Sequence, residues 1–377
     1  MNIGLYCNWS VYLVEGGFYI SPIHARYIEQ VQQMGYSVTL LSNVQKERKA
    51  GLTFFSYKDV SLIPLPNFTS YISSIRRVFS IFDGLRNLCR NSDVLYIRTF
   101  EPFSWLISLF SSKSQRIHFH IIANPLSAIM GKTSESKLLR CIKVMLFYPE
   151  YIATLLVGSQ HHLSCNGASV ISEVPSFFKH KIKPIIESSL VDGDYKSHNI
   201  LQGDQITFLT VCDLRPAKGI DVLIRAYARF NKRYPGKSEL KIVGDGDILP
   251  NLQLLCKEQA VEESVMFLGF VPAGKALNSI YRSSDVFVMP SLSETGPRVL
   301  LEAMASSLYC ISTDVGYAPL LLDGGKGELI SPNSVDALIS SMVKVIESPE
   351  HCIVGAKKSF DFSKQYTLSK FFETLLN

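Results

Sequence analysis

The stretch VFVMPSLSETGPRVLLEAMA, residues 286–305, decides the fold because an apolar strand runs directly into a helix. Glu294 lies in the turn between them, which is rich in Ser, Gly and Pro, and Glu302 lies inside the helix. In an open parallel sheet, ligands bind outside the carboxyl ends of the strands, and a helix start attracts phosphate. Two acids at such a place suit a sugar nucleotide, one on the ribose and one on the second sugar, with the phosphates between them.

Outward from this stretch, apolar runs of strand length alternate with helical patterns through both halves of the chain. This alternation is typical of parallel strand–helix–strand folds. The sequence therefore predicts an α/β protein with two doubly wound, Rossmann-like domains facing across a cleft. In the first half, strands are expected at 2–6, 37–41, 94–97, 116–122 and 154–157.

The domain boundaries follow from a polar stretch without periodicity at 181–204, which we interpret as the interdomain linker. It separates a first domain at 1–180 from a second domain at 205–352. The remaining 353–377 ends in a helix that composition alone does not place.

Composition points to a globular, reduced protein. The chain has 377 residues, of which 47% are hydrophobic and 19% charged, and its eight cysteines include no CxxC pair. The N-terminus resembles a first strand instead of a signal peptide, and the longest apolar stretch holds Pro149 and Glu150 in its middle. We expect a cytoplasmic protein, either soluble or peripheral at the inner face of the cytoplasmic membrane.

The net charge of +5 is unevenly distributed: residues 1–180 carry 17 Lys and Arg against 10 Asp and Glu, whereas residues 181–377 carry 21 against 23. This favours an anionic partner for the first half only, either a membrane surface or a phosphorylated lipid. We expect no nucleic-acid partner, because no such binding motif is present. Residues 72–90 form a basic amphipathic pattern that suits a membrane interface or, more often, an ordinary domain helix with its apolar side in the core.

Two loops of the second half suit a diphosphate. LRPAKG places Arg215 and Lys218 between a strand and a helix, where they can hold phosphates or form a solvated basic loop. IVGDGD places Gly244 and Gly246 after the next strand. Glycines at this position either allow a ligand to approach the backbone closely or simply form a tight turn.

The helix start after Glu294 is a more specific signal. Pro297 is expected in the first helical turn, where its missing N–H costs nothing, with the amides around Arg298 and Val299 left for phosphate. Glu302 lies among apolar residues, where an unpaired acid is costly. Its alternative role is an ion pair with Arg298 four residues earlier.

The first half offers weaker candidates. Gly16 and Gly17 form a close-approach turn after the first strand. His120 is a candidate cleft residue on the strand RIHFHII, although a buried core histidine is the more usual case. Arg98 ends another strand, where it can meet an anionic acceptor or simply lie at the surface.

Residues 207–332 closely resemble the family 4 retaining glycosyltransferases of the GT-B fold. The motifs LRPAKGIDVLIRAY, LKIVGDGD, YRSSDVFVMPSLSETGPRVLLEAMA and ISTDVGYAPLLLDGGKGELISP follow the order and spacing of that family. The first half resembles it only loosely, through EGG after the first strand and DVLYIR.

The resemblance implies a first domain that binds the acceptor, a second that binds a nucleotide sugar, and a last helix that returns to the first domain. It implies that Glu294 contacts the donor sugar, that Glu302 binds the ribose, and that Lys218 stabilises the departing phosphates. It also implies retention of configuration without an obligatory metal or other cofactor, and a catalytic-region histidine for which His120 is the candidate.

Two positions depart from the family pattern. Asp213 stands where the family usually has an arginine, and Arg215 is the candidate replacement. Thr295 and Gly296 replace the usual Phe-Gly pair after the first glutamate, so the sugar pocket has a different shape.

Three functions remain open at this level. The first is a glycosyltransferase building a surface glycan, of lipopolysaccharide, O-antigen or capsule type, on a lipid-linked acceptor. The second is a non-hydrolysing sugar-nucleotide epimerase, which would need a cluster of acids in the first domain, where Asp93 and Glu101 are isolated. The third is a non-catalytic partner subunit, which Asp213 and the uncertain histidine suggest.

Overall fold

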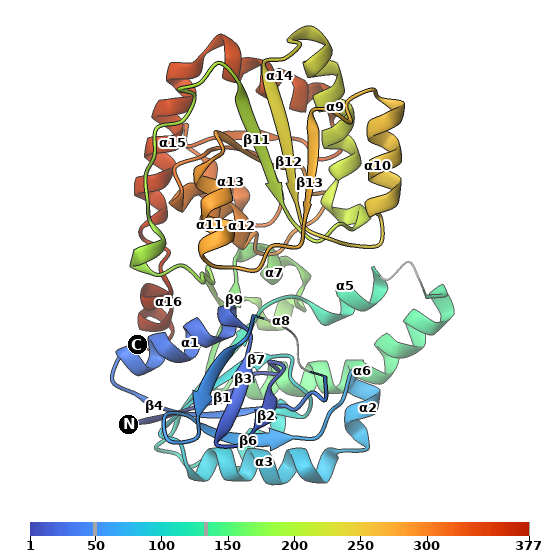
Figure 1. Ribbon diagram of the computed structural model, residues 1–377. Helices are drawn as coiled ribbons and strands as arrows, with labels where there is room; N and C mark the ends of the chain where they lie inside the picture. The colour runs from blue at the N-terminus through green and yellow to red at the C-terminus, as the bar shows by residue number, and fades with distance from the viewer. Residues whose placement is uncertain (48–50, 132–134, 377) are drawn as a thin grey trace. The chain divides into compact units, whose positions relative to one another are not determined.

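The structure, a computed structural model, describes residues 1–47, 51–131 and 135–376. It divides into two compact units (Figure 1). The first unit comprises Met1–Ile186 together with Phe371–Asn377, and the second comprises Glu187–Lys370.

The first unit is built on a parallel sheet of seven strands in the order β10-β9-β8-β7-β1-β4-β6. Its strands are largely buried, as expected for a parallel sheet that helices cover. Their bounds are β1 (Asn2–Tyr6), β4 (Ser37–Asn43), β6 (Ser61–Leu65), β7 (Val94–Thr99), β8 (Arg116–Ile121), β9 (His162–Asn166) and β10 (Lys183–Ile185).

A small antiparallel sheet, in the order β2-β3-β5, accompanies the large one. It consists of β2 (Tyr12–Val14), β3 (Gly17–Ile20) and β5 (Thr53–Ser56). The helices of this unit are α1 (Pro22–Gln33), α2 (Tyr71–Ile75), α3 (Val78–Arg90), η1 (Ser104–Leu106), α4 (Ile107–Phe110), α5 (Pro125–Met130), α6 (Lys137–Gly158), α7 (Ala168–Glu173), α8 (Ser176–Lys179) and the end of α16 (Leu368–Leu376).

The second unit is built on a parallel sheet of six strands in the order β13-β12-β11-β14-β15-β16. Its strands are β11 (Ile206–Val211), β12 (Ser238–Val243), β13 (Val265–Gly269), β14 (Val286–Met289), β15 (Tyr309–Thr313) and β16 (Glu328–Ile330). Its helices are η2 (Asp192–Asp194), η3 (Pro216–Lys218), α9 (Ile220–Arg233), α10 (Leu249–Glu258), α11 (Lys275–Arg282), α12 (Arg298–Ala305), α13 (Ala318–Leu322), α14 (Val335–Glu347) and α15 (Pro349–Ser363).

Each parallel sheet has one topological switch point, where the order of the strands reverses. In the first sheet the chain builds outward from β1 through β4 and β6 and then returns to β7 on the other side of β1. In the second it builds outward from β11 through β12 and β13 and returns to β14. Doubly wound sheets bind ligands in the crevice at the carboxyl ends of these central strands. The fold therefore indicates one candidate site in each unit.

The structure confirms the predicted doubly wound fold, but some elements differ from the prediction. Residues 154–157 are not a strand; they lie inside α6, and the strand follows at β9. The expected linker is not a separate segment, because β10 pairs with β9 in the first sheet and the second unit begins at Glu187. The segment 353–377 is divided between the two units. Its first part belongs to α15, which packs on α12, α13 and α14 of the second unit, and only Phe371–Asn377 belongs to the first unit.

The helix α6 continues through Pro149 and Glu150, which the sequence analysis treats as an interruption. It is the one helix among the described residues that is long and apolar enough to cross a membrane, by length and composition only. The Glu150 carboxylate is buried and accepts hydrogen bonds from the Phe103 amide at 2.6 Å and the Trp105 indole at 2.8 Å. These bonds tie this part of α6 to the core of the first unit.

Candidate functional site

Two loops meet at the switch point of the second unit, one after β11 and one after β14. The Leu292 amide donates a hydrogen bond to the Ala217 carbonyl at 2.8 Å. Gly219 has a φ of +62°, and a Cβ there would lie 2.2 Å from the Pro290 carbonyl oxygen. Only glycine fits such a close approach. The glycine after Lys218 therefore allows the two loops to pack together.

This packing brings together two of the residues predicted for the site. The Lys218 ammonium forms an ion pair with Glu294 Oε1, and both side chains are 13% exposed. The Ser291 hydroxyl donates to the same carboxylate oxygen at 2.9 Å. The Thr313 hydroxyl, at the end of β15, in turn donates to the Ser291 carbonyl at 2.7 Å. The Glu294 carboxylate is thus held in place by a cation and a hydroxyl.

The other charged residues of the first loop are more exposed. Arg215 and Asp213 both lie at the surface, on either side of the buried Leu214. Cys212 precedes them in the same loop. Burial raises the pKa of its thiol to about 12, and the charge of Lys218 acts in the opposite direction. Cys212 is therefore a neutral thiol at physiological pH. Arg215 is an exposed cation in the same loop as Lys218.

The glycines of IVGDGD have a structural explanation. A Cβ at Gly244 would lie 1.8 Å from the Cys212 carbonyl oxygen, and one at Gly246 would lie 2.3 Å from that of Leu214. The Leu214 amide also donates to the Asp245 carbonyl at 2.9 Å. Both glycines thus shape the loop that carries Lys218. Their predicted contact with the donor stays a prediction.

The helix α12 begins at Arg298, so Pro297 is the residue just before the helix and not in its first turn. The Arg298 amide donates to the Gly296 carbonyl at 2.9 Å, and the Leu300 amide donates to the Pro297 carbonyl at 3.1 Å. Since proline has no N–H, Val299 offers the candidate amide for phosphate among the three predicted residues.

Glu302, one turn into α12, accepts a hydrogen bond from the Tyr281 hydroxyl at 3.0 Å. Tyr281 lies on α11 and is almost fully buried. Burial, followed by the nearby Glu302 charge, raises the pKa of this phenol well above its ordinary value. Tyr281 is therefore a neutral donor that orients the carboxylate. Nothing in the spacing of α11 and α12 along the sequence indicates that the two side chains meet, so Tyr281 was not predicted.

A second tyrosine missed by the sequence analysis lies in the same region. Tyr317 is buried, and its hydroxyl makes no hydrogen bond among the described residues. Burial raises the pKa of this phenol, and the charge of Arg298 acts in the opposite direction. Its signal in the sequence is its position directly after TDVG.

In the first unit, the structure corrects the expectation that His120 is a cleft residue. Its ring is 0% exposed and packs edge-on against Phe371, with ring centroids 5.2 Å apart. Its Nδ1 lies 2.8 Å from the Ser164 hydroxyl on β9. His120 is a core histidine covered by α16, because the side chain points to the helix-covered face of β8.

The remaining candidates of the first unit are Gly16, Gly17 and Arg98, and the structure does not bring them together in one site. Gly16 lies in the turn of the β2–β3 hairpin and Gly17 begins β3, where a Cβ would lie 2.1 Å from the Phe55 carbonyl oxygen on β5. Strand pairing therefore explains Gly17. Arg98 is half-buried near the end of β7, close enough to Glu101 to influence its ionisation.

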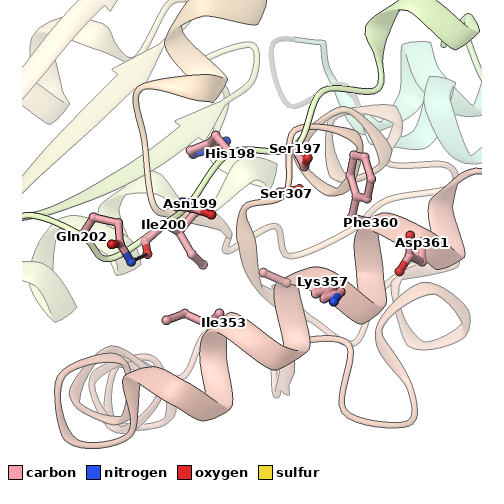
Figure 2. A pocket seen from close by; sticks show the side chains of 11 residues that line it. Ser197, His198, Asn199, Ile200, Gln202, Ser307, Ile353, Lys357, Phe360 and Asp361 are labelled. Carbon is pink, nitrogen blue, oxygen red and sulfur yellow. Dashed lines mark hydrogen bonds between the residues drawn. The ribbon is translucent and has the colours of Figure 1, made fainter.

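A separate pocket of about 330 Å³ lies elsewhere in the second unit. Figure 2 shows side chains of α15, among them Lys357 and Phe360, on one side and those of residues 197–202 on the other. His198 is held there by its Nε2, 2.9 Å from the Ser284 carbonyl oxygen. None of the predicted donor residues lines this pocket.

The sequence of the second unit is similar to those of known glycosyltransferases. The model of the family Glycosyl transferases group 1 matches residues 193–359. An uncharacterized glycosyltransferase of Haemophilus influenzae is 31% identical over 169 residues, which cover 44% of this chain and 47% of that protein. The GDP-mannose-dependent alpha-(1-6)-phosphatidylinositol monomannoside mannosyltransferase of Mycolicibacterium smegmatis is 32% identical over 155 residues, covering 39% and 40%. The chain spans less than half the length of each of these relatives.

Among solved structures, WaaG, a glycosyltransferase involved in lipopolysaccharide biosynthesis, matches 99% of this chain with 98% of its own. The TM-score is 0.68 at 14% sequence identity, which shows a shared fold. The second unit is thus similar to the group 1 glycosyl transferases, and the two units have the GT-B fold of such enzymes.

Proposed function

We propose that this chain is a retaining glycosyltransferase that transfers a hexose from a nucleotide sugar to a surface glycan or a lipid-linked acceptor. The observation that carries the proposal is the Lys218–Glu294 ion pair at the switch point of the second unit. It lies within the residues that match the glycosyl transferase family model. A cation and a carboxylate at this place suit the two halves of a nucleotide sugar, the diphosphate and the hexose.

Donor binding, in this proposal, exchanges one set of contacts for another. Without a donor, Lys218 and Glu294 neutralise each other. A diphosphate offers Lys218 a more highly charged partner, and sugar hydroxyls can donate to the Glu294 carboxylate. Arg215 and the Val299 amide add positive potential on the same side. As the bond to the anomeric carbon breaks, these groups stabilise the charge that develops on the leaving phosphate.

Glu302 is proposed to bind the ribose hydroxyls, with Tyr281 fixing its orientation. Gly244 and Gly246 contribute by shaping the neighbouring loop. His120 has no part in this chemistry because its ring is buried. The positive charges of the protein substitute for a cation on the diphosphate, so we expect activity to persist when EDTA is present.

The acceptor is proposed to be lipid-linked, as in lipopolysaccharide, O-antigen or capsule synthesis. The name of the Mycolicibacterium smegmatis relative describes a glycolipid acceptor, phosphatidylinositol monomannoside. The basic first half, with 17 Lys and Arg against 10 Asp and Glu, suits the anionic surface where such acceptors are found. The proposed location is therefore the cytoplasmic face of the membrane.

The proposal is tested with a panel of UDP-, GDP- and CMP-sugars, using saturation-transfer NMR for binding and product analysis for turnover. The full chain is expected to bind one class of nucleotide sugar and to hydrolyse it slowly when no acceptor is present. Glu294→Ala is expected to retain nucleotide binding but lose sugar contacts. Glu302→Ala is expected to weaken the binding of both the nucleotide and the nucleotide sugar.

Other outcomes would contradict the proposal. Interconversion of the free sugar nucleotides without hydrolysis would identify an epimerase. No binding of any nucleotide by the wild-type chain would support a non-catalytic partner subunit, for which the exposed Asp213 in place of an arginine is the motivating feature.

A further inference from the structure

The switch point of the first unit also carries a pair of loops, one after β1 and one after β7. Asn8 lies in the first loop and Glu101 in the second. The Asn8 amide donates a hydrogen bond to Glu101 Oε1 at 2.7 Å. The carboxylate therefore lies at the carboxyl edge of the sheet, where a doubly wound fold binds its ligand.

A pocket of about 510 Å³ opens at this edge and is lined by Glu101 and Asn8. Aromatic side chains contribute to its walls, from Phe68, Tyr71, Phe100 and Phe147. Flat aromatic faces with a polar group at one end are suited to a sugar ring, whose C–H faces pack on them while its hydroxyls reach the polar group.

Hydrogen bonds to residues of β1 and α6 hold the loop that carries Glu101 in place. The Tyr6 hydroxyl donates to the Pro102 carbonyl at 2.7 Å. The buried Glu150 accepts from the Phe103 amide and the Trp105 indole, in the part of the loop that follows. The pocket is thus pre-formed in the structure, and Glu150 supports it without lining it.

The charges at the pocket favour an uncharged headgroup. Burial raises the pKa of Glu101 to about 8, so its carboxyl is largely protonated at neutral pH. A protonated carboxyl can both donate to and accept from a hydroxyl group. The lysine that lines the pocket, Lys143, forms an ion pair with Glu135 and is already neutralised. A bare phosphate would therefore find no unpaired cation among the residues that line the pocket.

The rim of the pocket is apolar and exposed. Ile72 lines the pocket and is 46% exposed. On α6, Lys143 and Phe147 line the pocket, and the exposed Leu139 and Leu146 lie at helical spacing on the same side. Figure 1 shows α2, α5 and α6, which contribute to this rim, gathered at one side of the first unit. The apolar surface is thus continuous with a pocket that has a polar floor.

We propose that this pocket binds the acceptor and that the acceptor is an amphiphile, with an uncharged glycosyl headgroup on Glu101 and the aromatic walls and an alkyl chain on Ile72 and the apolar side of α6. The inference rests on the proposed transferase function, and it adds the acceptor's chemical class and its site. The aromatic walls bind the headgroup by its faces, Glu101 selects for a hydroxyl, and the rim binds the chain through burial of its methylene groups.

The test compares octyl glucoside, kept below its micellar concentration, with methyl glucoside as ligands of the full chain. Octyl glucoside is expected to bind about tenfold more tightly, since burial of two or three methylene groups suffices for that ratio. Ile72→Ser is expected to reduce this ratio about threefold or more. The matched control is Phe79→Ser on α3, at a position that is exposed but does not line the pocket.

Two variants of Glu101 test the headgroup contact. Glu101→Met removes the polar group and is expected to weaken both glucosides about tenfold, the worth of a buried hydrogen bond to such a group. Glu101→Gln retains an acceptor for the Asn8 amide and a donor for a hydroxyl, so it is expected to remain within about twofold of the wild type. A glucoside affinity that is the same in the wild type, Ile72→Ser and Glu101→Met would overturn the inference.

Nucleotide-sugar binding, measured on the same samples, separates this inference from the proposed function. All these variants are expected to bind the donor as the wild type does, because each lies in the first unit. If the wild type binds octyl glucoside in the predicted way but binds no nucleotide sugar, the transferase proposal fails and the amphiphile pocket stands. If it binds the donor but neither glucoside, the pocket inference fails and the transferase proposal stands.

Discussion

The two units of this protein share one topology but place different chemistry at the same point of the sheet. In the second unit, the loops at the switch point bring together a cation and a carboxylate, Lys218 and Glu294. In the first, the corresponding loops hold Glu101 against a backbone amide, in a pocket with aromatic walls. The topology determines where a ligand binds, and the loop residues determine which ligand it is.

One fold can thus offer sites for two different kinds of ligand at equivalent positions of its sheets. A charged pair that is partly buried is suited to a ligand that carries charge of its own and can replace each partner. A carboxyl group among aromatic rings is suited to an uncharged, hydroxyl-bearing ligand. Each of the following predictions changes one side of this comparison.

The largest effect is expected for Lys218→Ala. Loss of this cation removes charge stabilisation from the leaving phosphate and should reduce the rate of donor hydrolysis about 10²- to 10³-fold. Steady-state kinetics with the donor found in the panel measures this. Lys241→Ala is the matched control, since Lys241 also forms an ion pair in the second unit, with Glu239 at 2.9 Å, and should stay within about twofold of the wild type. Equal losses in the two variants would remove Lys218 from the site.

A smaller effect is expected for Tyr281→Phe. This variant removes the hydroxyl that orients Glu302 without changing the shape of the side chain. The KM for the donor should rise about threefold to tenfold, as for loss of a hydrogen bond to a charged group, while kcat changes little. Tyr309→Phe removes a similar bond, to Glu328 at 3.2 Å, and should leave both constants unchanged. A fall in kcat with an unchanged KM would contradict the assignment of Glu302 to donor binding.

The smallest effect concerns stability and pH in the first unit. Burial raises the pKa of Glu150 from 4.5 to about 7, with bonds from Trp105 and Phe103 opposing the shift. The Glu150 carboxyl therefore loses its proton at a lower pH in the unfolded chain than in the folded one. As a result, the free energy of unfolding falls as the pH rises from about 4.5 towards 7. Glu150→Gln should make this fall in the thermal midpoint shallower. The exposed Glu29→Gln on α1 serves as the control, and equal slopes in Glu150→Gln and wild type would refute the prediction.

The fold was largely predictable because the alternation of strands and helices is a local pattern. Strands such as β1, β7 and β14 follow directly from apolar runs bounded by turn residues. The same rule fails at 154–157, because an apolar run of this length occurs equally in a helix that packs on the core, and α6 is such a helix. The hairpin of β2 and β3 was also missed, although glycines such as Gly16 in its two-residue turn are a recognised signal for one.

The site was predictable only where the residues adjoin a strand or a helix start. Glu294 and Lys218 each lie in a strand–helix turn, so the sequence indicates their edge of the sheet. Their contact depends on the approach of Gly219 to Pro290, which lies far away in the sequence. Tyr281, Tyr317 and Glu101 were not recognised as site residues because their roles come from burial and from neighbours on other elements.

The most direct test of the central claim is hydrogen–deuterium exchange of the full chain with and without the nucleotide sugar that binds in the panel. The account predicts that the donor slows exchange in residues 212–219 and 290–303, the two loops at the switch point of the second unit and the start of α12. It predicts no protection in residues 99–105 of the first unit. Protection in residues 99–105 without protection in either loop of the second unit would contradict the account.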